Sequence, residues 1–362
     1  MKAICPRCGL VGTLNPKRIK GHTYYYVVHR INGKLKCCYI GKPSTLEVPI
    51  DWRNWLSIAP YFGGKKFVVP YLAKFIPPHR VYVEVFGGMA CFLLNKPKSP
   101  IEIYNDIDGD LVRLFRTIRD KWEGIYERYK WLLPSRELFL EWQRKWVSGW
   151  RPEDDCEHAA IMIYLGGLIV KGFAGGTSMS TRAIVPGCVG VTSISDGRLM
   201  LDSHEKIYKW LRRLHSRLAR VMIERLDYRE CIRKYDGPET FFYLDPPYLK
   251  SMEKHKSEYA ISGSWSYDDY RELKRVLDGV EGKWLMNHAE NDFIEDLFNE
   301  YYILKVKVVR STQTKRHGEK REYYTEMLIA NYPLLETLKP GNPIELSKNE
   351  LHKLRKNTKD NV

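Results

Sequence analysis

The stretch Phe241-Phe242-Tyr243-Leu244-Asp245-Pro246-Pro247-Tyr248 joins an apolar run to a rigid polar turn. Residues 240–244 have the composition of a buried strand, and the two prolines after it fix the backbone and cannot donate hydrogen bonds, so their carbonyl oxygens can project into a site. Open α/β sheets bind ligands at the carboxyl ends of their strands. The stretch therefore predicts an α/β sheet with a ligand site at this turn, an ordinary structural turn being the plainer alternative.

Short apolar segments recur on both sides of this stretch and alternate with helical patterns, as in an open α/β sheet. The expected strands are 81–86, 101–105, 240–244, 283–287, 302–309 and 325–332. The last two flank a polar loop at 312–321, which predicts an antiparallel hairpin at the end of the sheet. We expect the basic tail 336–362, polar after Lys339, to be mobile.

The strand pattern stops in a segment at 121–221, which is helical and aromatic and then rich in glycine and serine over 172–199. A helix is expected over 204–221, with apolar residues at helical spacing on one face. Its other face is basic and carries Lys209, Arg212, Arg213, Arg217 and Arg220. The chain has 59 Lys+Arg against 44 Asp+Glu, a net charge of +15, and such an excess favours a polyanionic partner. A merely solvated basic face is the alternative.

Residues 1–45 have the composition of a separate small module, because four of the eight cysteines lie there. A β-rich run at 24–28 and a hairpin turn at Asn32-Gly33 separate the two cysteine pairs. So short a module can bury little apolar surface and needs a metal ion or a disulfide for stability. Tetrahedral zinc takes four thiolate or imidazole ligands. The favoured set is Cys5, Cys8, His29 and Cys38, with Cys37 able to replace either of the last two. Free thiols and buried cysteines are the alternative.

Four segments, in the right order, resemble the motifs of the Dam-like adenine-specific DNA methyltransferases. They are Ala59-Pro60-Tyr61-Phe62-Gly63-Gly64-Lys65, Val83-Glu84-Val85-Phe86-Gly87-Gly88, Tyr104-Asn105-Asp106-Ile107-Asp108 and Asp245-Pro246-Pro247-Tyr248. The resemblance covers residues 57–120 and 222–335, so the segment 121–221 falls where the family inserts a target-recognition domain. The sequence departs from the family pattern at Tyr61, Val85 and Met89. The amino-terminal module lies outside the resemblance.

The resemblance implies a Rossmann-like, S-adenosylmethionine-dependent sheet with a mainly helical insertion, acting on a flipped adenine in double-stranded DNA. It implies three catalytic residues, Asp245, Pro246 and Tyr248. It implies a cofactor site formed by Tyr61, Gly63, Lys65, Glu84, Phe86, Gly87, Gly88, Asp106, Asp227 and Asp245. With the insertion on the DNA, the contacts we expect from its loop and basic helix are Lys171, Arg182, Arg212 and Arg213.

Two other functions compete with this interpretation. One is the same chemistry on the amino group of cytosine or on RNA. The other is a non-catalytic, zinc-ribbon nucleic-acid-binding protein with a lapsed methyltransferase domain. The longest apolar run, at 159–170, is too short to span a bilayer, and the amino terminus lacks the apolar core of a secretory signal. We therefore expect a cytoplasmic monomer with structural zinc, no membrane contact and a cognate restriction endonuclease.

Overall fold

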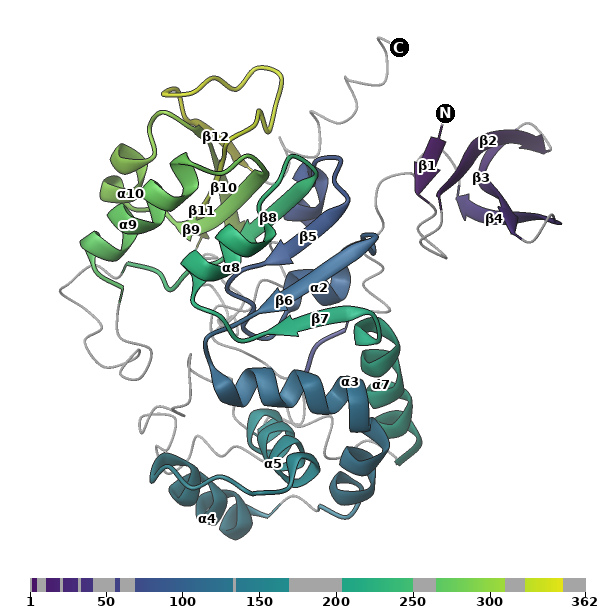
Figure 1. Cartoon of the computed structure of the whole chain (residues 1–362), viewed down its shortest axis with the longest axis vertical. Helices are drawn as coiled ribbons and strands as arrows, with labels where there is room; N and C mark the ends of the chain where they lie inside the picture. The colour runs from purple at the N-terminus through teal and green to yellow at the C-terminus, as the bar shows by residue number, and fades with distance from the viewer. Residues whose placement is uncertain are drawn as a thin grey trace, which may run out of the picture.

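The computed structural model describes residues 2–4, 11–19, 22–31, 34–41, 56–58, 69–132, 135–168, 204–249, 265–309 and 323–347. The strands in these ranges form two sheets, one of four strands and one of eight (Figure 1). The large sheet has the order β12-β10-β11-β9-β8-β5-β6-β7. Its strands are β5 (Val81–Glu84), β6 (Ile101–Asn105), β7 (Val221–Glu224), β8 (Thr240–Leu244), β9 (Lys283–Ala289), β10 (Tyr302–Val309), β11 (Tyr323–Ala330) and β12 (Ile344–Ser347).

The centre of this sheet is parallel, from β9 through β8, β5 and β6 to β7. Strand β11 pairs antiparallel with both β9 and β10, and so forms the predicted hairpin. Parallel strands bring their carboxyl ends to one edge. The turn after β8 therefore lies on the same edge as the loops that follow β5 and β6.

Alternate side chains of each central strand point to opposite faces of the sheet. Both faces are apolar, and helices cover each of them. One core contains Tyr82, Tyr104 and Tyr243, and the other contains Val83 and Phe242. The helices of the first core are α1 (Val69–Leu72), α2 (Cys91–Asn95), α3 (Gly109–Tyr129), α4 (Arg136–Val147), α5 (Asp155–Leu168) and α7 (His204–Leu218). Those of the second are α8 (Tyr228–Tyr235), α9 (Tyr267–Asp278) and α10 (Asp292–Leu297). The layered α/β fold predicted from the sequence is confirmed.

Two strands were missed by the sequence pattern. The helix expected over 204–221 ends at Leu218, and β7 begins at Val221. Its four residues alternate in exposure, but so short a strand gives little period-2 signal. Strand β12 pairs in parallel with β10 at the sheet edge. The expectation of a mobile tail is therefore wrong for Ile344–Ser347, because backbone pairing holds this part of the tail.

The segment between β6 and β7 is helical over residues 109–129, 136–147, 155–168 and 204–218, and it shares the first core with the sheet. Helix α3 crosses the expected domain boundary and is kinked there, where Lys121 leaves helical geometry. Figure 1 shows α3, α4, α5 and α7 gathered below β7. Arg217 corrects the predicted basic face of α7, because it is buried and bonded to Glu102 of β6.

The amino-terminal strands β1 (Lys2–Ile4), β2 (Val11–Ile19), β3 (His22–Ile31) and β4 (Lys34–Gly41) form an antiparallel sheet of their own. Ile31 pairs with Lys34, as expected for a hairpin around 32–33, and Cys38 pairs with Val27. Because Val27 and His29 share a face of β3, His29 and Cys38 lie on the same face of the sheet. Both are buried, whereas Cys37 is exposed on the other face.

Candidate active site

The turn Asp245-Pro246-Pro247-Tyr248 follows β8 and is anchored by hydrogen bonds with two neighbouring elements, α9 and β9. The hydroxyl of Tyr270, on α9, donates to the Pro247 carbonyl oxygen at 2.8 Å. The backbone N–H of Leu249 donates to His288 Nε2, on β9, at 3.1 Å. The Pro247 carbonyl is therefore directed to α9, which corrects the expectation that both proline carbonyls project into the site.

The Tyr248 hydroxyl reaches into a buried polar cluster on β9 and β11. It donates to Glu326 Oε2 at 3.0 Å and accepts from Asn287 Nδ2 at 2.5 Å. Asn287 Nδ2 also donates to Glu326 Oε2 at 3.0 Å. Burial raises the pKa of Tyr248 well above its usual value, and the neighbouring carboxylates of Glu326 and Asp245 raise it further. The hydroxyl is therefore a neutral donor at physiological pH.

The glycine loop after β5 packs tightly against the end of β6. A Cβ on Gly87 would collide with the Tyr104 ring and lie 2.8 Å from the Asn105 carbonyl oxygen. Gly88 has a φ of +48°, in the left-handed region that favours glycine. Only glycine at position 87 therefore lets the loop approach β6 this closely.

Asp106, at the end of β6, connects to this loop. Its carboxylate accepts from the backbone N–H groups of Gly88 at 2.7 Å and Asp108 at 2.9 Å. Burial raises the pKa of Asp106, although the backbone donors oppose this shift. A carboxylate has about four acceptor sites, so Asp106 can accept further hydroxyl donors.

Asn105 joins the ends of three adjacent strands. Its Nδ2 donates to the Val85 carbonyl oxygen at 2.9 Å and to the Leu226 carbonyl oxygen at 3.1 Å, and its Oδ1 accepts from the Leu226 N–H at 2.9 Å. The residue is 1% exposed. Asn105 therefore fixes the loops after β5 and β7 relative to β6.

An aromatic group lies beside the glycine loop. The Phe86 ring centroid is 5.6 Å from that of Tyr228 and 5.3 Å from that of Trp265. Asp227 caps α8 and forms an ion pair with Arg229, with Nε to Oδ1 at 2.7 Å. That hydrogen bond is the main reason that the pKa of Asp227 is lowered. The predicted cofactor residues Phe86 and Asp227 thus lie near one another, at the start of α8.

Glu84 lies beneath the loop rather than on its surface. Its Oε2 accepts from the Tyr82 hydroxyl at 2.6 Å and from the Leu93 N–H at 2.7 Å. Burial raises the pKa of Glu84 to about 8. Glu84 therefore carries a proton for much of the time at neutral pH, and its position under the loop indicates a supporting role for this predicted cofactor residue.

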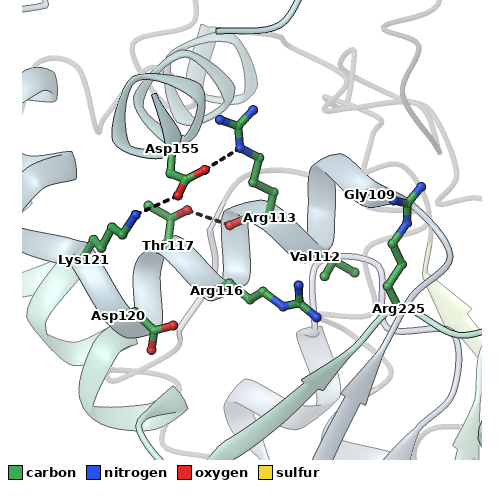
Figure 2. Close-up of a pocket in the computed structure, with 9 residues that line it drawn as sticks. All are labelled: Gly109, Val112, Arg113, Arg116, Thr117, Asp120, Lys121, Asp155 and Arg225. Carbon is green, nitrogen blue, oxygen red and sulfur yellow. Dashed lines mark hydrogen bonds and ion pairs between the residues drawn. The ribbon is translucent and has the colours of Figure 1, made fainter. Parts of the chain in front are cut away.

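A pocket of about 470 Å³ lies on α3, near the end of β7 (Figure 2). Cationic side chains dominate its lining, which consists of Gly109, Val112, Arg113, Arg116, Thr117, Asp120, Lys121, Asp155 and Arg225. Asp155 forms ion pairs with Arg113 and Lys121, each at 2.8 Å. The sequence analysis did not indicate this pocket.

The remaining predicted residues are placed unevenly. Tyr61, Gly63, Lys65, Lys171, Arg182, Cys5 and Cys8 lie outside the described residues. Arg212 and Arg213 are exposed on α7. Within the part of the chain that the structure describes, no three His, Cys, Asp or Glu side chains form a metal-binding group. Since Cys5 and Cys8 are outside that part, the predicted zinc ligand set stays a prediction.

Tyr270, Asn287 and His288 lie near the turn but were not predicted from the sequence. Asn287 and His288 lie near the end of the apolar strand β9, on the same edge of the sheet as the turn. Polar residues at the end of an apolar strand could have indicated from the sequence that they lie near the site. Tyr270 gave none, because its spacing on α9 is that of an ordinary core residue.

Comparison with known proteins agrees with this geometry. Residues 61–187 and 192–312, more than half of the chain, match the D12 class N6 adenine-specific DNA methyltransferase family. The chain belongs to this family. It is also 24% identical over 296 residues to the type II methyltransferase M.MjaIII of Methanocaldococcus jannaschii, covering 75% of this chain and 96% of that protein. Among the described residues, no helix is long and apolar enough to cross a membrane.

Proposed function

We propose that this protein is a site-specific, adenine-specific DNA methyltransferase, which transfers a methyl group from S-adenosylmethionine to the 6-amino group of a flipped adenine. The observation that carries the proposal is the shared edge of β8, β5 and β6. There the Asp245-Pro246-Pro247-Tyr248 turn lies beside the Gly87-Gly88 loop and Asp106.

The turn has the groups that the reaction on adenine needs. The amino group of adenine is a poor nucleophile, because its lone pair is delocalised into the ring. The Asp245 carboxylate and the Pro246 carbonyl oxygen would accept hydrogen bonds from its two N–H groups and localise that lone pair. Tyr248 would stack on the base, which must leave the DNA stack for its amino group to be reached.

The residues after β5 and β6 fit the cofactor. S-adenosylmethionine supplies, when bound, a methyl group on a sulfonium. The close packing at Gly87 leaves the backbone bare for a ligand, and Asp106 retains acceptor sites for the ribose hydroxyls. Phe86, Gly88 and Asp227 would flank the adenosine, with Asp227 exchanging part of its contact with Arg229 for the adenine amine. Tyr61, Gly63 and Lys65 are proposed for the methionine end from sequence alone.

We assign the amino-terminal sheet a structural zinc held by Cys5, Cys8, His29 and Cys38. The common face of His29 and Cys38 supports this choice over Cys37, whose side chain is on the other face. The enzyme is proposed to act as a cytoplasmic monomer, paired with a restriction endonuclease of the same specificity. The DNA contacts Lys171, Arg182, Arg212 and Arg213 remain part of this proposal, and exposure on α7 supports the last two.

The test is methyl transfer from labelled cofactor to unmethylated genomic DNA. The DNA is then digested to nucleosides and the modified bases are identified by mass spectrometry. The proposal expects N6-methyladenine at one mapped sequence. N4-methylcytosine, methylation of RNA alone, or no transfer by folded, cofactor-binding protein would contradict it, and the last result would favour the non-catalytic alternative.

A further inference from the structure

Tyr248 is held by two side chains that lie far from it in sequence. Glu326 and Asn287 project from the neighbouring strands β11 and β9, where Asn287 pairs with Leu328, two residues beyond Glu326. Glu326 is 2% exposed and Asn287 is fully buried. Two hydrogen bonds with the Tyr248 hydroxyl and a third between Asn287 and Glu326 form a closed triangle.

The Asn287 side-chain amide is oriented so that its nitrogen, and not its oxygen, faces Tyr248 and Glu326. Its Nδ2 donates to both Tyr248 and Glu326, while its buried Oδ1 has no hydrogen-bond partner among the described residues. An unsatisfied buried acceptor costs about 1–3 kcal/mol. A flipped amide would turn Oδ1 toward the Glu326 carboxylate, where two acceptors would repel each other. The contact with Glu326 and Tyr248 therefore determines the orientation of the amide.

One face of the Tyr248 ring is also supported. The His288 ring lies 4.6 Å from it between centroids, with an interplanar angle of 37°. His288 Nδ1 bonds the Ala289 carbonyl oxygen at 2.5 Å, so Nε2 is the acceptor for the Leu249 N–H. The turn and the ring are thus held by the same strand end.

We propose that Glu326 and Asn287 are positioning residues, which hold the Tyr248 ring so that a flipped adenine stacks on the face opposite His288. This inference rests on the proposed function and deepens it. Without partners for its hydroxyl, the Tyr248 ring can rotate about its side-chain torsions. Hydrogen bonds that fix the hydroxyl restrict this rotation before the base binds, so less conformational entropy is lost on stacking. Small misplacements of reacting groups can lower a rate by about 100-fold.

The test compares Glu326→Ala, Glu326→Gln and Tyr248→Phe in methylation of a duplex that carries the mapped site. Both donors reach the same carboxylate oxygen, so the amide oxygen of Glu326→Gln can replace it. We expect Glu326→Ala and Tyr248→Phe to lower kcat about 10- to 100-fold, with the cofactor Kd unchanged. Glu326→Gln should stay within about threefold of wild type. Glu345→Ala, which removes a surface glutamate on β12, is the matched control.

A second readout separates positioning from general structural damage. With 2-aminopurine in place of the target adenine, stacking on Tyr248 quenches the flipped base, so Glu326→Ala and Tyr248→Phe should be brighter than wild type. The double variant Glu326→Ala with Tyr248→Phe should be no slower than the slower of the two single variants, because both substitutions remove the same hydrogen bond between Tyr248 and Glu326. Additive losses, wild-type kcat in Tyr248→Phe, or loss of cofactor binding in Glu326→Ala would overturn the inference. An inactive wild-type enzyme would instead overturn the proposed function.

The pocket on α3 carries a second inference. In the described part of the chain, Arg116 donates to the backbone carbonyl oxygen of Ile223 and Arg225 to that of Ile107, each at 3.3 Å. Among the described residues, neither has a carboxylate within ion-pair distance, whereas Arg113 and Lys121 share Asp155. Figure 2 shows both side chains beside α3, with Arg116 extending from the helix and Arg225 lying near Gly109 at its start. Two guanidinium groups that form no ion pair with a described carboxylate favour an anion at this pocket, and arginine binds phosphate with paired hydrogen bonds.

We infer that this pocket binds a backbone phosphate of the DNA that flanks the flipped adenine. Arg225 directly follows β7, which is three strands from β8 in the sheet, or about 14 Å at the usual spacing. This distance is less than the width of a duplex, so a helix lying over the turn after β8 can also reach the pocket. The inference rests on the proposed function.

The test is the salt dependence of duplex binding for Arg116→Gln with Arg225→Gln. Losing two phosphate contacts should make the slope of log affinity against log salt shallower by about 1–2. Arg271→Gln with Arg275→Gln, a matched change on exposed α9 residues, should leave the slope unchanged. An unchanged slope in the pocket variant, or the same change in the control, would overturn the inference. Wild-type protein that binds the duplex with the expected salt dependence but transfers no methyl group would overturn the proposed function and not this inference.

Discussion

Arg217 and Glu102 form a buried ion pair between two parts of the chain that are 115 residues apart. Arg217 Nη1 lies 2.6 Å from Glu102 Oε2 and Nη2 lies 3.0 Å from Oε1. Lys96 Nζ contacts the same carboxylate at 2.5 Å. Burial would raise the pKa of Glu102, but the two cations lower it overall, so the carboxylate is charged. The pair fixes the last helix of the segment between β6 and β7 to the sheet.

Arg217→Met should therefore destabilise the fold strongly. Arg217→Met removes one of the two cations that hold the buried Glu102 carboxylate and leaves only Lys96, and breaking a buried ion pair costs about 3–5 kcal/mol of unfolding free energy. Arg213→Met, four residues earlier on an exposed face of α7, should cost less than about 0.5 kcal/mol. Urea unfolding of both variants measures the difference. Equal stabilities would show that the pair does not hold α7 to the sheet.

Stability should also depend on the protonation of Glu84. Its pKa rises from 4.5 to about 8 on folding, mainly through burial. The folded state therefore binds a proton more tightly than the unfolded chain between these values, and stability falls as the pH rises through this window. Glu84→Gln lacks this loss, so its free energy of unfolding should fall less between pH 5 and 8.5. Parallel curves for the two proteins would contradict the shift, because other titrating groups cancel in the comparison.

Gly87→Ala tests the glycine loop. The added Cβ would meet the Tyr104 ring and the Asn105 carbonyl oxygen, so the loop must move away from β6. We expect the affinity for S-adenosylmethionine to fall by about tenfold or more, equivalent to at least about 1.4 kcal/mol. In Gly237→Ala the new atom would lie 4.0 Å from Thr240 Oγ1, so cofactor affinity should be unchanged. Calorimetric titration of both variants decides between a tight loop and a tolerant one.

The amino-terminal sheet gives a matched pair of cysteines. Cys38→Ser should release zinc and Cys37→Ser should keep it, because only Cys38 shares a face with His29. Elemental analysis and thermal unfolding of both variants measure the effect, and a chelator should destabilise the Cys37→Ser protein. If only Cys37→Ser lost zinc, Cys37 and not Cys38 would be the ligand. Wild-type protein that contains no zinc would contradict the proposed zinc site.

The central strands were predictable because each is long and apolar enough to stand out. The bounds expected for 101–105, 240–244 and 302–309 agree with the structure. Strand β7 was not predictable, since Val221 also continues the apolar spacing of the preceding helix. Arg217 was placed on the basic face of this helix, for DNA contact or solvent, because helical periodicity does not show which arginine has a partner elsewhere in the fold.

For the site, sequence motifs indicated the residues at strand ends but not the contacts that hold them. The turn after β8, the glycine loop and Asp106 were expected together, and the strand order brings them to one edge. The triangle of Tyr248, Asn287 and Glu326 depends on the antiparallel register of β9 and β11. Such a register cannot be read from the separate strands, so the triangle became visible only in three dimensions.

The most direct test of the proposed function is single-turnover methylation by Asp245→Ala at saturating cofactor and DNA. If the Asp245 carboxylate accepts a hydrogen bond from the adenine amine, its contribution grows as positive charge develops on the nitrogen. Losing such a preorganised partner costs on the order of 10²–10³ in rate, or about 3–4 kcal/mol. We predict that loss with the fold and most DNA affinity intact and cofactor binding measured in parallel. A rate within about tenfold of wild type, with both ligands bound, would contradict the assignment of Asp245.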